Sequence, residues 1–182
     1  MFLKEDHLVL IGGVVVGRQY TIASTEMINE TQKLCNLKSY PSHVYGHASS
    51  ITPTGIVSCG GYGMSSDRDL PKLCKRLSAS GNWVPFPSLT NIRRYFGMIT
   101  MNGHIWVIGG QTPYGAKSLY TMEYIDFENP QQWKKEEIPF GAFGHCVSEL
   151  PNNQLLVTGG RQQLINADGV ADCGHTAHLV RL

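Results

Sequence analysis

The sequence predicts an all-β fold built from repeated four-stranded units, and two observations lead to that prediction. Twin glycines occur four times along the chain, at intervals of 48, 49 and 50 residues. Each pair follows a short run of β-branched or aliphatic residues, too short for a helix and bounded by turn residues, which is typical of a buried strand. The four pairs are Gly12-Gly13, Gly60-Gly61, Gly109-Gly110 and Gly159-Gly160.

A tight turn precedes each of the last three of these strands. Asn102-Gly103 stands between two apolar runs, which is the strongest short signal for a β-hairpin. Pro53-Thr54-Gly55 and Pro151-Asn152-Asn153 occupy the corresponding places in the other two units. Each of these units therefore contains a strand, a tight hairpin and a second strand that ends in twin glycines.

A second repeated position lies 13 or 14 residues before a glycine pair, at His47, Phe96 and His145. A position repeated in this way usually reports packing, and a ligand role would not survive the replacement of histidine by Phe96. We therefore expect His47 and His145 to be structural, each closing a hydrogen bond inside its own repeat unit.

Large aromatic residues mark the later part of each unit. Trp83 and Trp133 lie 22 and 23 residues after Gly61 and Gly110, whereas the first unit has Cys35 at this place. Tyr124 falls in the third strand expected within 119–125. Four strands in about 50 residues are typical of a β-propeller blade, and we expect the tryptophan to fill the widening gap between neighbouring blades.

The pattern resembles the kelch repeat over nearly the whole chain, most clearly from Arg93 to Gly110. The resemblance implies an incomplete kelch-type β-propeller of about three and a half blades. Their approximate bounds are 7–43, 44–91, 92–141 and 142–182, the last being partial and ending in a loop and one strand at 178–182. An open stack exposes sheet edges and an apolar face at each end, through which the chain can self-associate.

The same resemblance implies a protein-binding face formed by two sets of loops at one end of the propeller. The loops between second and third strands are 14–24, 62–71, 111–118 and 161–169, and the inter-blade loops are 40–44, 90–94 and 140–142. Tyrosine and arginine are enriched at binding hot spots. The predicted partner-binding residues are Tyr40, His43, Tyr62, Arg68, Arg93, Arg94, Tyr114 and Arg161.

The function that follows is a non-enzymatic module for protein–protein interaction. The chain has no G-x-S-x-G elbow, no P-loop and no G-x-G-x-x-G, so no catalytic residue, metal or cofactor is predicted. A net charge of +1 without a basic run argues against nucleic acid, and no apolar run is long enough to span a membrane. The alternative is part of a galactose-oxidase-like copper enzyme, which would need tyrosine, histidine and cysteine at the metal.

The five cysteines leave the compartment open. They are widely spaced, with no C-x-x-C pair, and we favour buried free thiols. The alternative is an extracellular recognition domain with a disulfide, for which Cys59 and Cys74 are the first pair to test because they can face each other across neighbouring strands. No signal peptide precedes the repeats, so the default location is cytoplasmic. The five are Cys35, Cys59, Cys74, Cys146 and Cys173.

A compact group near the C-terminus, Cys173, His175 and His178, contains residue types that bind zinc. It lies in the tail of the repeat, where polar residues accumulate freely. We interpret it as structural and predict no metal there.

Overall fold

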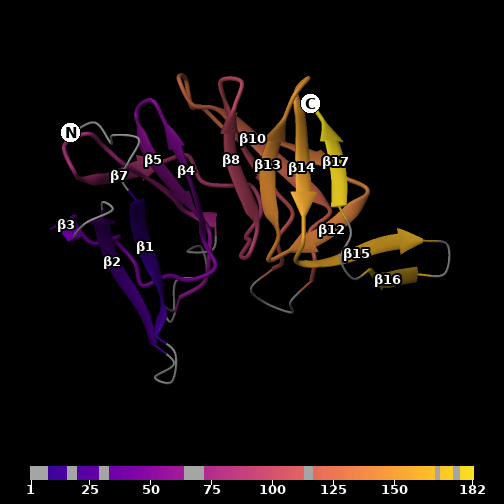
Figure 1. Ribbon diagram of the computed structural model, residues 1–182, viewed down its shortest axis with the longest axis horizontal. Coiled ribbons are helices and arrows are strands. Elements are labelled where there is room, and N and C mark those ends of the chain that lie inside the picture. The colour runs from indigo at the N-terminus through magenta and orange to yellow at the C-terminus, as the bar shows by residue number, and fades with distance from the viewer. Residues whose placement is uncertain are drawn as a thin grey trace.

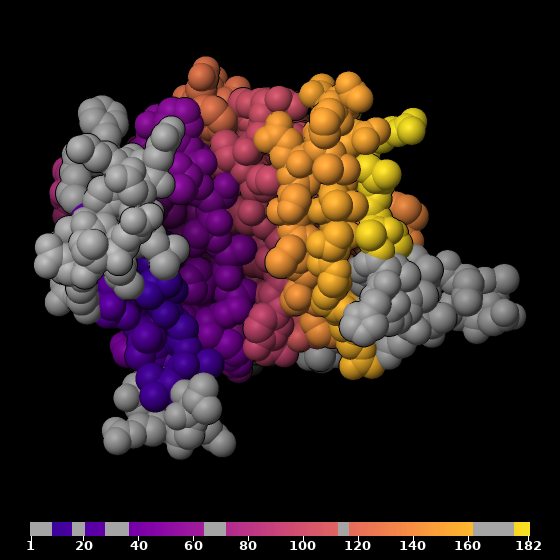
Figure 2. Space-filling model, viewed as in Figure 1, coloured from indigo at the N-terminus to yellow at the C-terminus, as the bar shows by residue number. Residues whose placement is uncertain are grey.

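A computed structural model describes residues 8–15, 20–28, 33–63, 72–112, 117–166, 169–173 and 177–182. Throughout these residues the chain forms short strands in five antiparallel sheets. Four of the sheets follow one another along the chain and stand side by side, as the order of colours in Figures 1 and 2 shows. The fold is therefore an incomplete β-propeller, as predicted, and we call these four sheets blades 1 to 4.

Blades 2 and 3 are complete four-stranded sheets whose strands pair in chain order. The turn between the first two strands of blade 3 has positive φ at both Asn102 (51°) and Gly103 (75°), which a two-residue type I′ hairpin requires. Blade 2 consists of β4 (Ala48–Thr52), β5 (Gly55–Cys59), β6 (Cys74–Leu77) and β7 (Trp83–Phe86), and blade 3 of β8 (Gly97–Met101), β9 (His104–Ile108), β10 (Thr121–Asp126) and β11 (Lys134–Glu137).

Blades 1 and 4 have three strands each among the described residues. They leave apolar side chains in solvent at the two ends of the stack, where Leu10 is 47% and Leu179 60% exposed. Blade 1 consists of β1 (Leu8–Val15), β2 (Tyr20–Ile28) and β3 (Lys33–Asn36), and blade 4 of β13 (Cys146–Leu150), β14 (Gln154–Thr158) and β17 (Ala177–Arg181).

Two of the predicted loops are wrong. The segment predicted as loop 161–169 belongs largely to a hairpin of β15 (Arg161–Asn166) and β16 (Gly169–Cys173). Its first strand pairs with β12 (Phe140–Phe143), which the prediction treated as an inter-blade loop. The hairpin projects beside blade 4 (Figure 1).

The first loop is also shorter than predicted. Strand β1 continues through Gly12-Gly13 by means of a bulge, and β2 begins at Tyr20. The two ends of predicted loop 14–24 therefore belong to strands.

The first strands of blades 2, 3 and 4 (β4, β8 and β13) lie side by side (Figure 1). The hydroxyls of Ser50 and Thr100 are 2.7 Å apart between β4 and β8. Nearer the hairpin turns, the side-chain Nδ2 of Asn102 donates to the side-chain Oδ1 of Asn153 at 2.9 Å. One apolar core cluster lies between blades 2 and 3 and a second between blades 3 and 4, so each blade shields its neighbours from water.

The tryptophans close the outer part of the gap between blades, as predicted. Trp133 is 4% exposed and packs edge-on against Phe86, with ring centroids 6.5 Å apart. Its indole N–H donates to the carbonyl of Pro87 at 2.8 Å, and that of Trp83 donates to the carbonyl of Lys38 at 2.9 Å. Each tryptophan therefore ties its own blade to the segment that leaves the preceding blade.

The prediction of buried free thiols is wrong for three cysteines. Cys59 and Cys74 are opposite each other on β5 and β6, with Cα atoms 4.1 Å apart, and form a buried disulfide. The alternative pairing considered from the sequence is therefore the one observed. Cys146 is a free thiol but is exposed, because no further blade of the described residues packs against its side of β13.

Candidate partner-binding face

The loops between second and third strands and the inter-blade segments lie at the same end of the blades. The N–H of the second glycine of a pair donates to the carbonyl of the segment entering the next blade. These bonds run from Gly13 to Val44 (2.8 Å), from Gly61 to Arg93 (2.9 Å) and from Gly110 to Ala142 (2.6 Å). We call this end the loop face and the opposite end, which carries the hairpin turns, the turn face.

A second chain of hydrogen bonds links the innermost residues of the loop face. The N–H of Tyr95 donates to the carbonyl of Gly46, and the N–H of Gly144 donates to the carbonyl of Tyr95, both at 2.7 Å. All three residues have positive φ, of 65°, 55° and 66° for Gly46, Tyr95 and Gly144. Tyr95 therefore stands in a conformation that favours glycine, at a place where the neighbouring repeats have glycine.

Four side chains converge beside this residue, and we call Tyr45, Tyr62, Arg94 and Tyr95 the Tyr–Arg cluster. The guanidinium carbon of Arg94 lies 5.6 Å from the ring centroid of Tyr62 and 5.2 Å from that of Tyr95. The ring of Tyr45 packs edge-on against Tyr62 at 5.8 Å and against Tyr95 at 6.3 Å. These distances are within the range of cation–π and aromatic-pair contacts.

The backbone under the cluster is held by paired hydrogen bonds. Tyr45 and Tyr62 exchange N–H to carbonyl bonds of 2.9 and 2.8 Å, and Arg94 and Gln111 exchange two of 3.0 Å. The cluster is nevertheless accessible, because Tyr95 is 37% exposed and the other three side chains are half-buried. The result is an aromatic and cationic surface on a rigid support.

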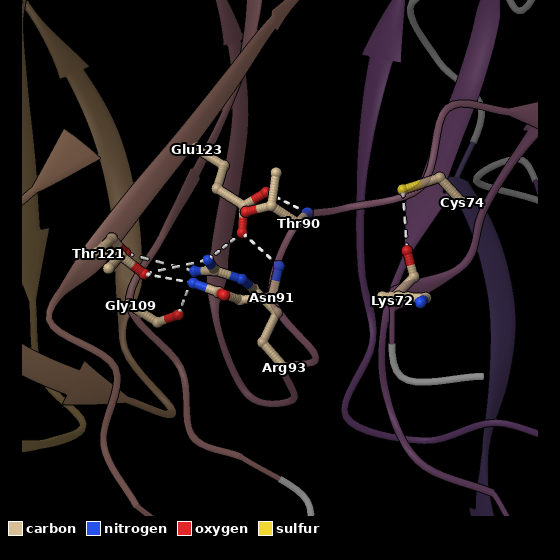
Figure 3. A network of polar contacts seen from close by, with 8 residues as sticks. All are labelled: Lys72, Cys74, Thr90, Asn91, Arg93, Gly109, Thr121 and Glu123. Atoms are coloured by element: carbon tan, nitrogen blue, oxygen red, sulfur yellow. Dashed lines mark hydrogen bonds and ion pairs between the residues drawn. The ribbon is translucent and has the colours of Figure 1, made fainter. Parts of the chain in front are cut away.

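Arg93, the neighbour of Arg94, is the first correction among the predicted binding residues. It is fully buried and forms an ion pair with Glu123, which is also fully buried. Its guanidinium also donates to the carbonyl of Gly109 at 2.7 Å and to the hydroxyl of Thr121 at 3.2 Å (Figure 3). Burial lowers the pKa of Arg93 and the charge of Glu123 raises it. Arg93 is a structural residue and offers no surface to a partner.

The carboxylate of Glu123 also fixes the loop that enters blade 3. It accepts the backbone N–H groups of Thr90 at 2.6 Å and Asn91 at 3.1 Å (Figure 3). The network of Arg93 and Glu123 therefore joins this loop to β10 and to the end of β9, directly behind Arg94 and Tyr95.

Tyr40 is the second correction. It was predicted on the loop face but is only 4% exposed. Its ring packs edge-on against Trp83 at 4.8 Å and stacks on His47 at 6.1 Å. Burial raises the pKa of Tyr40 to about 12. The side chain belongs to the packing between blades 1 and 2.

The remaining predicted binding residues divide into two groups. His43 is exposed, with its ring Nδ1 2.6 Å from the carbonyl oxygen of Thr21, and Arg161 is exposed on β15. Arg68 and Tyr114 lie outside the described residues. Of the eight predicted residues, only Tyr62 and Arg94 belong to the Tyr–Arg cluster.

The two repeated histidines are largely buried, and the prediction that their hydrogen bonds lie inside one blade is wrong for His145. The Nε2 atom of His145 accepts the N–H of Gly97 at 3.2 Å, so this bond joins blade 4 to blade 3 and does not lie inside one blade. Burial lowers the pKa of both His47 and His145 to about 4, and hydrogen bonds to the backbone of Ile11 and Ile108, in the preceding blades, raise it slightly.

The described residues of the C-terminal group, Cys173 and His178, do not gather as a metal site. His178 stacks on Phe140 with ring centroids 4.0 Å apart, Cys173 is the last residue of β16, and His175 lies outside the described residues. No three His, Cys, Asp or Glu side chains gather as a metal site within the described ranges. Those ranges also contain no helix long and apolar enough to cross a membrane.

Tyr45, Tyr95 and Glu123 were missed as site residues. Tyr95 carried a usable signal, because the aligned repeats have Gly46 and Gly144 at its position, and a tyrosine in place of a turn glycine is unusual. Glu123 stands as a single charge among the apolar residues of a predicted strand, which indicates a buried partner. Tyr45 had no signal beyond its place next to Gly46.

These features define a class of protein, an incomplete β-propeller with a repeated twin-glycine strand and an inter-blade tryptophan. A family model described as the Kelch motif matches residues 92–135. Residues 92–135 therefore contain a kelch motif.

Three relatives with kelch in their names are similar in sequence to this chain. The chain is 26% identical over 153 residues to Kelch repeat and BTB domain-containing protein 2 of Cowpox virus (strain GRI-90 / Grishak), covering 82% of this chain and 26% of the relative. The protein of the same name from Horsepox virus is 25% identical over the same shares of the two chains. Kelch-like protein 40a of Danio rerio is 26% identical over 85 residues, which are 46% of this chain and 14% of the relative. The chain thus spans about a quarter or less of the length of these relatives.

Proposed function

We propose that this chain is a non-enzymatic protein-interaction module that binds its partner through the loop face, at the Tyr–Arg cluster. The kelch repeats of the chain and of its relatives support the general role. The convergence of Tyr45, Tyr62, Arg94 and Tyr95 from two blades is the observation that supports the location.

The energetics of the cluster suit binding. Tyrosine and arginine present large contact areas and forked donors, and they dominate measured binding hot spots. The paired backbone hydrogen bonds at Tyr45–Tyr62 and Arg94–Gln111 hold these side chains before a partner arrives, so little ordering entropy is lost on association.

Backbone conformation gives an independent argument. A non-glycine residue in the left-handed region costs about 1 kcal/mol, and Tyr95 adopts it where Gly46 and Gly144 would adopt it freely. A Cβ atom on Gly46 would lie 2.9 Å from the ring of Tyr95, so the glycine leaves room for that ring. Local strain of this kind is retained where the side chain has a function.

The test is a selection of peptides from a phage-displayed random library on the chain, followed by fluorescence-polarisation titration of the selected peptides. The variant is Tyr95→Gly, which removes the ring, relieves the strained backbone and restores the residue of the neighbouring repeats. We expect at least about tenfold weaker binding, while the free energy of unfolding changes by no more than about 1 kcal/mol.

The matched control is Lys135→Gln, on the exposed outer strand β11. It removes an exposed charge that is not part of the Tyr–Arg cluster and should leave the affinity unchanged. Equal affinities for wild type and Tyr95→Gly, or a loss with Lys135→Gln instead, would contradict the proposed location.

A further inference from the structure

We propose that a pocket between blades 1 and 2, on the turn face, is a binding site for a small uncharged aromatic molecule. The pocket has a volume of about 450 Å³, which is within the range of known small-molecule sites. Blade 1 contributes Met27 of β2 and Leu37, and blade 2 contributes the end of β4, the turn into β5, Leu77 of β6 and the turn after it. The site lies at the end of the blades opposite the Tyr–Arg cluster, so this inference is independent of the proposed function.

The wall of the pocket is largely apolar. Met27 and Leu77 line it with side chains that are 1% and 5% exposed, whereas Ile51, which is 63% exposed, leaves aliphatic surface open to solvent. None of the described lining residues carries a charge. A ligand that removes this aliphatic surface from water therefore gains hydrophobic free energy on binding.

The hydroxyl groups of the wall already have hydrogen-bond partners within their own turns. The hydroxyl of Thr52 donates to the carbonyl of Gly55 at 2.8 Å, and it lies 3.2 Å from the hydroxyl of Thr54. The hydroxyl of Ser78 donates to the carbonyl of Asn82 at 2.9 Å. These bonds hold the two turns in place before a ligand arrives. An ionised ligand would lose its hydration here without a compensating partner, so the pocket favours an uncharged one.

The interface between blades 2 and 3 shows what fills the corresponding space. Leu77 and Ile125 are equivalent, because each pairs with the isoleucine four residues before a glycine pair. Two residues further on, blade 3 has Phe127, whereas blade 2 has Ala79. Phe127 is 9% exposed and belongs to the core cluster between blades 2 and 3. Ala79 is exposed and lines the pocket, so the pocket is the space that an aromatic ring fills in the next interface.

Two features favour an aromatic ligand. Its ring would take the place that Phe127 has between blades 2 and 3. The thioether of Met27 is an adaptable side chain that makes favourable contacts with aromatic rings. Because a cavity of about 150 Å³ is enough to bind benzene, the pocket has room for a molecule of one or two rings.

The experiment titrates the ¹⁵N-labelled chain with three probes of matched size and follows the amide chemical shifts. The probes are benzyl alcohol, cyclohexylmethanol with a saturated ring, and benzoate with a charge. We expect benzyl alcohol to bind at least about threefold more tightly than cyclohexylmethanol and about tenfold more tightly than benzoate. The shifts should be largest at the amides of Gly55, Ala79 and Gly81, which line the pocket.

The blocking variant is Ala79→Phe, which gives blade 2 the residue that blade 3 has at this place. It should weaken the binding of benzyl alcohol at least about tenfold, because the new ring occupies the site. The matched control is Ser80→Phe, which adds the same ring at the neighbouring exposed position, outside the described lining. This control should leave the affinity unchanged.

Each part of the proposal has its own contradicting result. Equal or tighter binding of cyclohexylmethanol would overturn the aromatic class, and equal binding of benzoate would overturn the preference for an uncharged ligand. Shifts centred on other amides, or an affinity that Ala79→Phe leaves unchanged, would overturn the site itself. The shift map of the wild-type chain decides the location even if the variant does not fold. Because Tyr95→Gly tests the loop face separately, these results leave the proposed function unaffected.

Discussion

Two buried histidines make the stability of this fold sensitive to mild acid, and the effect can be calculated. Burial lowers the pKa of His145 from the ordinary value of 6.5 to about 4, and that of His47 likewise. The unfolded chain therefore takes up these protons at a higher pH than the folded chain. Stability is complete above about pH 6.5 and decreases as the pH falls from 6.5 toward 4.

The magnitude follows from the two pKa values. At pH 5 an unfolded histidine is almost fully protonated and the buried one is almost neutral, which corresponds to a loss of about 2 kcal/mol for each. The perturbation is His145→Phe, since Phe96 occupies the same position in the preceding repeat. This variant lacks the hydrogen bond from the N–H of Gly97. Its free energy of unfolding should nevertheless fall by about 2 kcal/mol less than that of wild type when the pH is lowered to about 5.

The assay is urea denaturation at pH 7.5 and pH 5.0, with the free energy of unfolding compared for wild type, His145→Phe and His47→Phe/His145→Phe. The pH-dependent loss should decrease stepwise along this series. An identical loss in all three proteins would refute the reasoning, because acid sensitivity would then arise from carboxylates elsewhere.

Two further predictions concern the buried charges and the disulfide. Glu123→Ala leaves the buried Arg93 without its counter-charge, so the free energy of unfolding measured by urea denaturation should fall by about 3–5 kcal/mol. The apolar double variant Arg93→Met/Glu123→Leu should recover much of this loss. A loss below about 1 kcal/mol in the single variant would contradict the ion-pair network. Thiol titration of the denatured, unreduced protein should find two fewer thiols than titration after reduction, which frees all five cysteines. The variant Cys59→Ala/Cys74→Ala should lower the free energy of unfolding by about 3 kcal/mol, because the disulfide joins residues 15 positions apart. Equal thiol counts before and after reduction would show that the pair is not oxidised.

Much of the fold could be predicted because its signals are local. The Gly-Gly strands and the Asn102-Gly103 turn depend on backbone conformations that few residues adopt, so their positions are visible in the sequence. The hairpin of β15 and β16 was missed for a different reason. Its first strand is completed by β12, about 20 residues earlier, and such pairing depends on tertiary structure.

The candidate site shows the limit most clearly at Arg93 and Arg94. The two residues are identical in type and adjacent in sequence, so both were predicted at the surface. The structure buries Arg93 because Glu123, 30 residues later, supplies a counter-charge. The guanidinium of Arg94 instead lies over the rings of Tyr62 and Tyr95. Among the described residues, no carboxylate forms an ion pair with it.

The sequence by itself determined the repeat length, the strands that end in twin glycines, the tryptophans between blades and the kelch relationship. Those features depend on residue type and short spacing, and each repeat reports them independently. Only the tertiary structure decided which arginine is accessible, that Tyr40 is core and that Tyr45 and Tyr95 complete the Tyr–Arg cluster. Burial and charge pairing depend on residues that are distant in sequence, and they are settled only when the blades stack.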